Sequence, residues 1–180
     1  MAHTNLDSID RTLCDALQKN GRIHFNELAP LVSLSVPAVS ERVRKLEERG
    51  VIQGFHAHLN PEAFELDILA FIFVTVDSSA NHKAFLKKCK QHPEVLECHA
   101  TTGDFSHLLK IRTRNTASLE KLLSDVQRWD GVRKTLTNLV LSTHSESLAV
   151  PTGAQEPPAV KKTTKPKRRT RTRNAAPAEA

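Results

Sequence analysis

This sequence of 180 residues lacks the features of an exported or membrane-bound protein. Its longest apolar run, Ile68 to Val74, is too short to cross a bilayer, and its N-terminus has no positively charged region followed by an apolar one. Its three cysteines, Cys14, Cys89 and Cys98, are an odd number without C-x-x-C spacing. We therefore expect reduced, structural cysteines in a cytoplasmic protein.

The body of the chain also lacks net charge. The formal net charge of the whole chain is +6, and the residues from Pro151 onward carry 8 Lys or Arg and 2 Asp or Glu. The first 150 residues therefore hold 18 side chains of each sign and balance to zero. This neutrality argues against a protein that coats nucleic acid with its whole folded surface, and it leaves room for a localised basic helix.

The stretch from Phe25 to Arg44 predicts two short helices joined by a tight turn, which is the pattern of a helix-turn-helix. The first helix is expected from about Asn26 to Val32. The second begins with Ser35 as its N-cap and Pro37 in its first turn. A serine hydroxyl accepts a backbone N–H that is free at a helix start, and proline lacks the N–H that would have no partner there.

The second helix has two distinct faces. Val39, Val43 and Leu46 fall on one face, which must pack against a domain core. The other face presents small residues first and cations one or two turns later, which suits insertion into a major groove. The predicted DNA contacts are Ser35, Pro37, Ala38, Ser40, Arg42, Arg44 and Lys45. An amphipathic helix with a solvated charged face explains the same pattern.

Another helix precedes this pair in the chain, so the domain has three helices. Its apolar residues recur at helical spacing behind Asp7, a suitable N-cap, and the pattern ends at Asn20-Gly21. The last helix ends at Arg49-Gly50, and a hinge strand is expected to follow it. We predict a winged helix-turn-helix domain at 1–60, a second domain at 61–150 and a separate tail at 151–180.

The second domain alternates strands and helices. The predicted order is strand, helix, strand, strand, helix, strand, which is the ferredoxin-like βαββαβ arrangement of an α+β protein. The elements are expected at 69–77, 81–91, 95–101, 105–113, from 116 to about 129, and at 132–143, with Phe85, Leu86 and Cys89 facing inward from the first helix and Thr116 capping the second.

Both helices of this fold lie on one face of the sheet, so the other face is uncovered. The first strand is apolar on both sides, as Ile72, Phe73 and Val74 show. A soluble monomer does not tolerate a bare apolar sheet face of several hundred square ångströms. We therefore predict a homodimer with its sheets face to face.

The tail changes to a composition rich in Pro, Ala, Thr, Lys and Arg without apolar periodicity, which predicts a disordered segment. The predicted phosphate contacts in it are Lys165, Lys167, Arg168, Arg169, Arg171 and Arg173. A solubilising tail and an arm that reads AT-rich minor grooves are the alternatives.

With these segments placed, the chain from about residue 4 to 148 resembles the Lrp/AsnC family of bacterial and archaeal transcription regulators. The matching stretches are Leu6-Asp7-x-x-Asp10, Gly21-Arg22-Ile23, Leu34-Ser35, Glu41-Arg42-Val43-Arg44-Lys45-Leu46-Glu47, Gly50-x-Ile52-x-Gly54-Phe55 and Gly103-Asp104-Phe105. The resemblance implies a nucleoid-associated protein with double-stranded DNA as partner. It also implies a RAM/ACT-like ferredoxin domain that forms dimers and higher assemblies such as octamers, with an amino-acid effector bound between dimers.

Three features depart from the family pattern. Ser33 stands where the family has glycine in the turn, so we expect a positive φ there at a cost of order 1 kcal/mol. Val36-Pro37-Ala38 replaces a more polar run, which favours contact with thymine methyl groups over hydrogen bonds to bases. The basic tail is not a family feature.

The resemblance places the effector at the hairpin turn. Backbone N–H groups of Thr102, Gly103 and Asp104 can bind an α-carboxylate, and Asp104 could instead accept an α-ammonium group. Trp129, Asn138, Leu139 and Val140 align with positions where the family senses its effector. An ordinary hairpin turn is the simpler interpretation of Gly103-Asp104.

Two other classes of function stay open. An architectural multimer could compact DNA with its basic arm. An enzyme is the third class, because siroheme decarboxylases resemble this family and use histidines; the candidates here are His56, His58, His99 and His107, without a spacing that brings them together. Metal binding through Cys98-His99 is no stronger. We expect no enzyme, no metal and no cofactor beyond an amino-acid effector.

Overall fold

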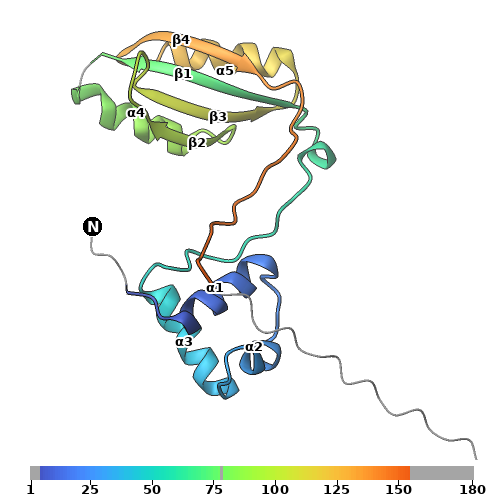
Figure 1. Cartoon of the computed structure of the whole chain (residues 1–180). Coiled ribbons are helices and arrows are strands. Elements are labelled where there is room, and N and C mark those ends of the chain that lie inside the picture. The colour runs from blue at the N-terminus through green and yellow to red at the C-terminus, as the bar shows by residue number, and fades with distance from the viewer. Residues whose placement is uncertain (1–4, 78, 155–180) are drawn as a thin grey trace, which may run out of the picture. The chain divides into compact units, whose positions relative to one another are not determined.

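The computed structural model describes residues 5–77 and 79–154 and divides into two compact units (Figure 1). Within the described residues, the helical unit comprises 5–56 and 149–154, and the sheet unit comprises 57–77 and 79–148. The expected boundaries at residues 60 and 150 stay predictions. Residues 149–154 group with the N-terminal helices.

The helical unit contains three helices, α1 (Ser8–Lys19), α2 (Phe25–Leu31) and α3 (Val36–Glu48). Both predicted N-caps are present, because the Asp7 side chain accepts a hydrogen bond from the Asp10 amide at 2.7 Å and the Ser35 hydroxyl accepts one from the Ala38 amide at 3.4 Å. The predicted apolar face of α3 is fully buried. Its side chains pack with α1 and α2 residues in one core that includes Leu13, Leu17, Leu28, Val39 and Val43.

The turn between α2 and α3 has the predicted backbone. Ser33 adopts a φ of 54°, and the next amide, that of Leu34, donates to the Ala29 carbonyl at 3.1 Å. The hinge strand, in contrast, is not formed. Residues 53–60 have no strand beside them in the described chain, and an extended segment without a hydrogen-bonding neighbour is not a β-strand. A short 3-10 helix, η1 (Pro61–Phe64), follows it.

The sheet unit has the predicted ferredoxin-like topology. Its elements are β1 (Ile68–Val76), α4 (Ser79–Gln91), β2 (Val95–Ala100), β3 (His107–Thr113), α5 (Thr116–Gln127) and β4 (Val132–Leu139). The four strands are antiparallel in the order β2-β3-β1-β4 (Figure 1). The central strands are β3 and β1; β2 lies at the edge beside β3, and β4 lies at the edge beside β1.

The core of the sheet unit lies between one sheet face and the two helices. Alternate β1 residues such as Ile72 and Val74 are fully buried there against Phe85 of α4 and Leu122 of α5. Leu86, which we expected inside, is 39% exposed. The inward face of α4 is set by Phe85 and Cys89 at i and i+4, and Leu86 lies about 100° around the helix from Phe85.

Two element ends were also predicted incorrectly. Asn115, not Thr116, caps α5, because its side chain accepts a hydrogen bond from the Ser118 amide at 2.9 Å. The last strand ends at Leu139 and not near residue 143; the Val140 amide makes one further bond, to the Leu69 carbonyl, at the start of β1. Since β1 begins at Ile68, β4 has no partner strand beyond this point.

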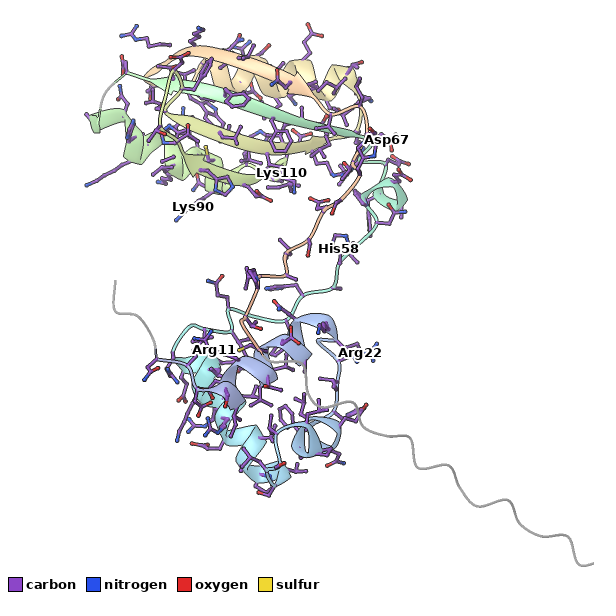
Figure 2. All side chains as sticks on the ribbon, in the orientation of Figure 1. Arg11, Arg22, His58, Asp67, Lys90 and Lys110 are labelled. Atoms are coloured by element: carbon purple, nitrogen blue, oxygen red, sulfur yellow. The ribbon has the colours of Figure 1, made fainter. Side chains whose placement is uncertain are left out.

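The opposite sheet face, which we call the open face, carries neither helix. Phe73 lies on it between Leu108 of β3 and Leu136 of β4, and Phe105 contacts the Phe73 ring at a centroid distance of 5.6 Å. Leu136 is 48% exposed. Polar side chains surround this apolar centre, including Lys110, which donates to Glu97 (Figure 2). The open face is thus apolar at its centre and charged at its margin.

Candidate DNA-binding and effector sites

Helix α3 is fixed against α1 by a charged cluster. The guanidinium of Arg42 donates to Asp7 and to Asp10, each at 2.7 Å, and Asp10 is almost completely buried. Arg49, just after α3, lies 3.9 Å from the second Asp10 oxygen. Hydrogen bonds to the two carboxylates raise the pKa of Arg42, so this cation stays charged. The cluster connects both ends of α1's first turn to the middle of α3.

This arrangement bears on the predicted DNA contact of Arg42. Its side chain is one-third exposed and points toward α1, whereas Arg44 lies on the outer face of the same helix. Two of the guanidinium's hydrogen bonds are already made within the unit. Arg42 therefore has a positioning role that the sequence did not reveal, and its contact with DNA stays a prediction.

The outer face of α3 carries cations that are paired with carboxylates of the same helix. Arg44 donates to Glu41 at 2.7 and 2.9 Å and also bonds Glu48, and Lys45 lies 3.4 Å from Glu41. The hydrogen bond from Arg44 is the largest cause that lowers the pKa of Glu41 to about 2. Water screens exposed pairs of this kind, so they add little stability and phosphate can displace the carboxylates at little cost.

The N-terminal turn of α3 presents a small, smooth surface. Ser35, Pro37 and Ser40 are exposed and Ala38 is partly exposed. The Ser35 hydroxyl caps the helix, as predicted, and its contact with DNA stays a prediction. Small side chains at a helix start allow the backbone to approach a groove floor closely.

The predicted contacts of the basic tail, from Lys165 to Arg173, lie outside the described residues. The segment that leads to them is described up to Ala154, and it runs along α1. Gln18 and Arg11 of that helix bond the backbone of Val150 and Thr152. The tail thus starts from the helical unit.

The predicted effector residues do not come together within one chain. The turn at 102–104 is exposed, Gly103 has a φ of 104°, and the Asp104 carbonyl accepts a hydrogen bond from Thr75 at 3.3 Å. Trp129 is instead buried on the helix side of the sheet, where its ring contacts Phe85. Asn138 lies on the open face opposite Phe71. The sheet therefore separates Trp129 from Asn138.

Two cavities of the sheet unit are lined by described residues, and of the seven predicted effector residues Val140 lines the smaller one. The larger, of about 950 Å³, lies beside η1 and the start of α5. Its apolar wall includes Phe64 and Leu96, and its rim carries Arg112, Arg114 and Lys121. The smaller, of about 620 Å³, lies along the segment after β4. Both have the size of small-molecule sites, and the sequence pointed to neither.

The histidines proposed for an enzyme are dispersed. His107 is buried against the rings of His82 and Phe85, and burial lowers its pKa. His99 is exposed and bonds Glu97 at 3.0 Å. Within residues 5–77 and 79–154, no group of three or more His, Cys, Asp or Glu side chains is placed to hold a metal ion.

Two further structural findings concern cysteines and membranes. Cys89 of α4 lies in the core of the sheet unit and Cys98 of β2 packs against it, and the interaction between the two thiols lowers the pKa of Cys98 and raises that of Cys89. Their spacing of nine residues gave no sign of this contact.

Among the described helices, none combines the length and the apolar character that a membrane span requires.

Comparison with known families agrees with both units. Residues 6–47 match the AsnC-type helix-turn-helix domain, and residues 69–150 match the Lrp/AsnC ligand binding domain. The first match covers α1 to α3, and the second begins at β1 and extends past β4. The two matches follow the same order as the units in this chain.

Individual relatives match along almost their whole length. The chain is 37% identical over 146 residues to the HTH-type transcriptional regulator FL11 of Pyrococcus furiosus, covering 81% of this chain and 96% of that protein. It is 38% identical to the leucine-responsive regulatory protein of Escherichia coli, covering 79% and 89%.

Solved structures show the same relationship. A Neisseria meningitidis transcriptional regulator in complex with L-methionine superposes with a TM-score of 0.77 at 29% identity, over 82% of this chain and 97% of that one. A feast or famine regulatory protein of M. tuberculosis complexed with L-methionine gives 0.73 at 36%, over 81% and 99%. Together with the two domain matches, these similarities show that the chain belongs to the Lrp/AsnC family of transcriptional regulators and is not an enzyme.

Proposed function

We propose that this protein binds double-stranded DNA at specific operators through α3, and that a small amino acid modulates its assembly and its DNA binding. It acts on the nucleoid in the cytoplasm. The observation that carries the proposal is the presentation of α3. Arg42 fixes one side of the helix to α1, and the other side is free to contact a groove. A helix with only a solvated charged face would not need an ion pair to a buried carboxylate, such as that of Asp10, to set its orientation.

Recognition by this helix combines shape with exchangeable charge. Pro37 and Ala38 offer apolar contact to thymine methyl groups at the groove floor. Arg44 and Lys45 exchange their bonds to Glu41 for bonds to phosphate as the helix docks. Because Glu41 stays on the helix, docking also places a carboxylate near the DNA, where it opposes wrong registers.

The experiment is a titration of operator DNA with the double variant Arg44→Ala/Lys45→Ala across several salt concentrations. The salt slope should fall by about 0.9 for each lost phosphate contact, and specific binding should weaken while the protein stays folded. The matched control is Lys87→Ala/Lys88→Ala in α4, which removes the same charge from the sheet unit. Normal operator binding by the α3 variant at moderate salt would show that the recognition face is wrongly assigned.

Assembly is proposed to use the open face. The apolar centre formed by Phe73, Phe105, Leu108 and Leu136 is suited to a second copy of the same sheet, and its charged margin can pair across a two-fold axis. A dimer formed this way, assembling further and possibly to an octamer, also brings together sites from different chains. An effector site built from two chains would not require the predicted effector residues to lie close together within one chain.

The effector is proposed to be an amino acid bound at the turn of residues 102–104. The relatives support the class of ligand: two are solved with L-methionine and one is named for its response to leucine. A thermal-shift screen with the twenty amino acids should therefore begin with methionine and leucine. Ligand at one hundred times its dissociation constant stabilises the folded state by about 2.7 kcal/mol.

The basic tail supports a second function, which is compaction of DNA with little sequence choice. Footprinting separates the two. Phased protection at a few operators supports regulation, and uniform coverage at the same protein concentration supports an architectural role.

A further inference from the structure

The larger cavity of the sheet unit, of about 950 Å³, has a wall of large apolar side chains that are open to water. Leu59 comes from the segment before η1, Phe64 from η1 and Leu96 from β2, and each of them is more than half exposed. Apolar side chains that are exposed singly are common, whereas several around one hollow indicate a binding surface. This wall is therefore suited to an apolar group of a ligand.

Hydrogen bonds hold both sides of this wall to the sheet. The Arg112 guanidinium donates to the Leu66 carbonyl, just after η1, at 3.0 Å, and the Leu66 amide donates to the Pro61 carbonyl at 3.1 Å. The Arg112 amide also donates to the Glu94 carbonyl, just before β2, at 2.9 Å. One residue of β3 thus fixes the segments that carry Phe64 and Leu96, so the cavity is part of the folded unit.

Most of the negative charge around the cavity is already neutralised. Three carboxylates line it, of which Glu146 pairs with Lys110 and Asp125 pairs with Arg128 at 3.4 Å. The third carboxylate, that of Glu94, faces three further arginine and lysine side chains of the lining. The cavity therefore carries an excess of positive charge, which attracts an anion.

Two of these three cations are available to an anion. Arg114 follows the end of β3, and Lys121 lies on α5 beside Leu122, which lines the same cavity. Both are exposed, and within residues 5–77 and 79–154 neither forms an ion pair with a carboxylate. A carboxylate can thus accept charge-assisted hydrogen bonds from them without breaking an existing pair.

We propose that this cavity binds an organic carboxylate with an apolar body, which lies against Phe64 and Leu96 while the carboxylate meets Arg114 and Lys121. The site goes beyond the proposed effector site at residues 102–104. That turn joins one end of β2 to β3, and the cavity lies at their other ends; the six residues of β2 span about 20 Å. Because the excess positive charge repels an α-ammonium group, the cavity favours a carboxylate that has none.

The test measures the affinity of the full chain for 4-phenylbutyrate by isothermal titration calorimetry. The matched compound is 4-phenylbutan-1-ol, which keeps the apolar body and lacks the charge. We expect the carboxylate to bind about tenfold more tightly than the alcohol, because it gains charge-assisted hydrogen bonds. Equal affinities for the two compounds would overturn the role of the cations, and a wild-type chain that does not bind 4-phenylbutyrate would overturn the site.

A charge-removing variant locates the carboxylate. Arg114→Gln/Lys121→Gln should weaken binding of 4-phenylbutyrate by about tenfold and leave binding of the alcohol unchanged. The matched control is Lys87→Gln/Lys90→Gln, which removes the same charge from exposed positions of α4 that do not line the cavity. An equal loss in the control would show that the probe responds only to net charge.

A second variant locates the apolar body. Phe64→Ser should weaken binding of both compounds by about fivefold, because each loses apolar contact with the ring. Since Phe64 is exposed, the unit should stay folded, and the thermal transition of Trp129 fluorescence checks this. Unchanged binding of both compounds by the folded variant would remove η1 from the site.

Competition separates this cavity from the effector site. Leucine and methionine should not displace 4-phenylbutyrate, and Asp104→Ala should bind it as tightly as wild type does. Displacement by either amino acid, or loss of binding in Asp104→Ala, would assign the probe to the turn and overturn the proposal. None of these variants alters α3, so the outcome is independent of the proposed DNA binding.

Discussion

Asp10 should contribute more to the helical unit than any surface ion pair of α1. Its side chain is 8% exposed and meets Arg42 at 2.7 Å, whereas Asp15 on the same helix meets a 72% exposed Lys19 at 2.8 Å. Removing one partner of a buried pair costs about 3–5 kcal/mol. Arg42 keeps its bond to Asp7 and some contact with water, so we expect about 2 kcal/mol for Asp10→Ala. Asp15→Ala should cost about 0.5 kcal/mol or less.

The two units can be followed separately in one thermal experiment. A domain the size of the helical unit loses about 4–8 °C for each kcal/mol, so Asp10→Ala should lower its melting temperature by about 10 °C. Circular dichroism at 222 nm includes this transition. Trp129, the single tryptophan, lies in the core of the sheet unit, so its fluorescence reports that unit. We expect the fluorescence transition to stay in place.

Asp15→Ala controls for the loss of one carboxylate and for the higher helix propensity of alanine, since both changes occur on α1. Shifts of similar size in the two variants would refute the argument that the cluster around Asp10 determines how α3 is held. A matching shift of the Trp129 transition would show instead that the substitution acts on the whole molecule.

Three further predictions concern the sheet unit. Phe73→Lys should convert a dimer to a folded monomer in sedimentation, because Phe73 lies on the open face. Val74→Lys should instead unfold the unit, because Val74 is fully buried. If both variants stay folded and dimeric, this prediction is wrong. Asp104→Ala should abolish ligand-induced changes in oligomer size and leave unliganded DNA affinity intact, and a wild-type response would remove Asp104 from the site. Burial lowers the folded-state pKa of His107, so stability should fall as pH drops from 7 to 5.5; His107→Gln should flatten this dependence in Trp129 fluorescence, and an unchanged slope would exclude His107 as its source.

Much of the local structure could be predicted because its causes are local. The Asp7 and Ser35 caps, the positive φ of Ser33 and the buried face of α3 each depend on residues within one or two turns of each other. The order of strands and helices likewise predicted the ferredoxin-like topology, because few arrangements of that order are physically allowed. The family resemblance then implied the function.

The candidate sites depended on contacts that the sequence does not encode locally. Arg42 and Arg44 are two residues apart and both cationic, yet one bonds α1 and the other bonds its own helix. Helical rotation separates their directions, but the partner of each depends on which element packs beside it. The same holds for the predicted effector residues: strand register placed Asn138 on the open face, whereas Trp129 follows the end of α5 and packs into the core on the helix side.

The sequence by itself determined which segments become helices and strands, and how they are ordered, because capping and apolar periodicity act over a few residues. Only the tertiary structure decided that Gln18 bonds Val150, that Cys89 meets Cys98, and that the chain returns to its first unit before the tail begins. Each of these contacts forms between segments that lie on different elements. Their free energy depends on the packing of the whole unit, which no local pattern specifies.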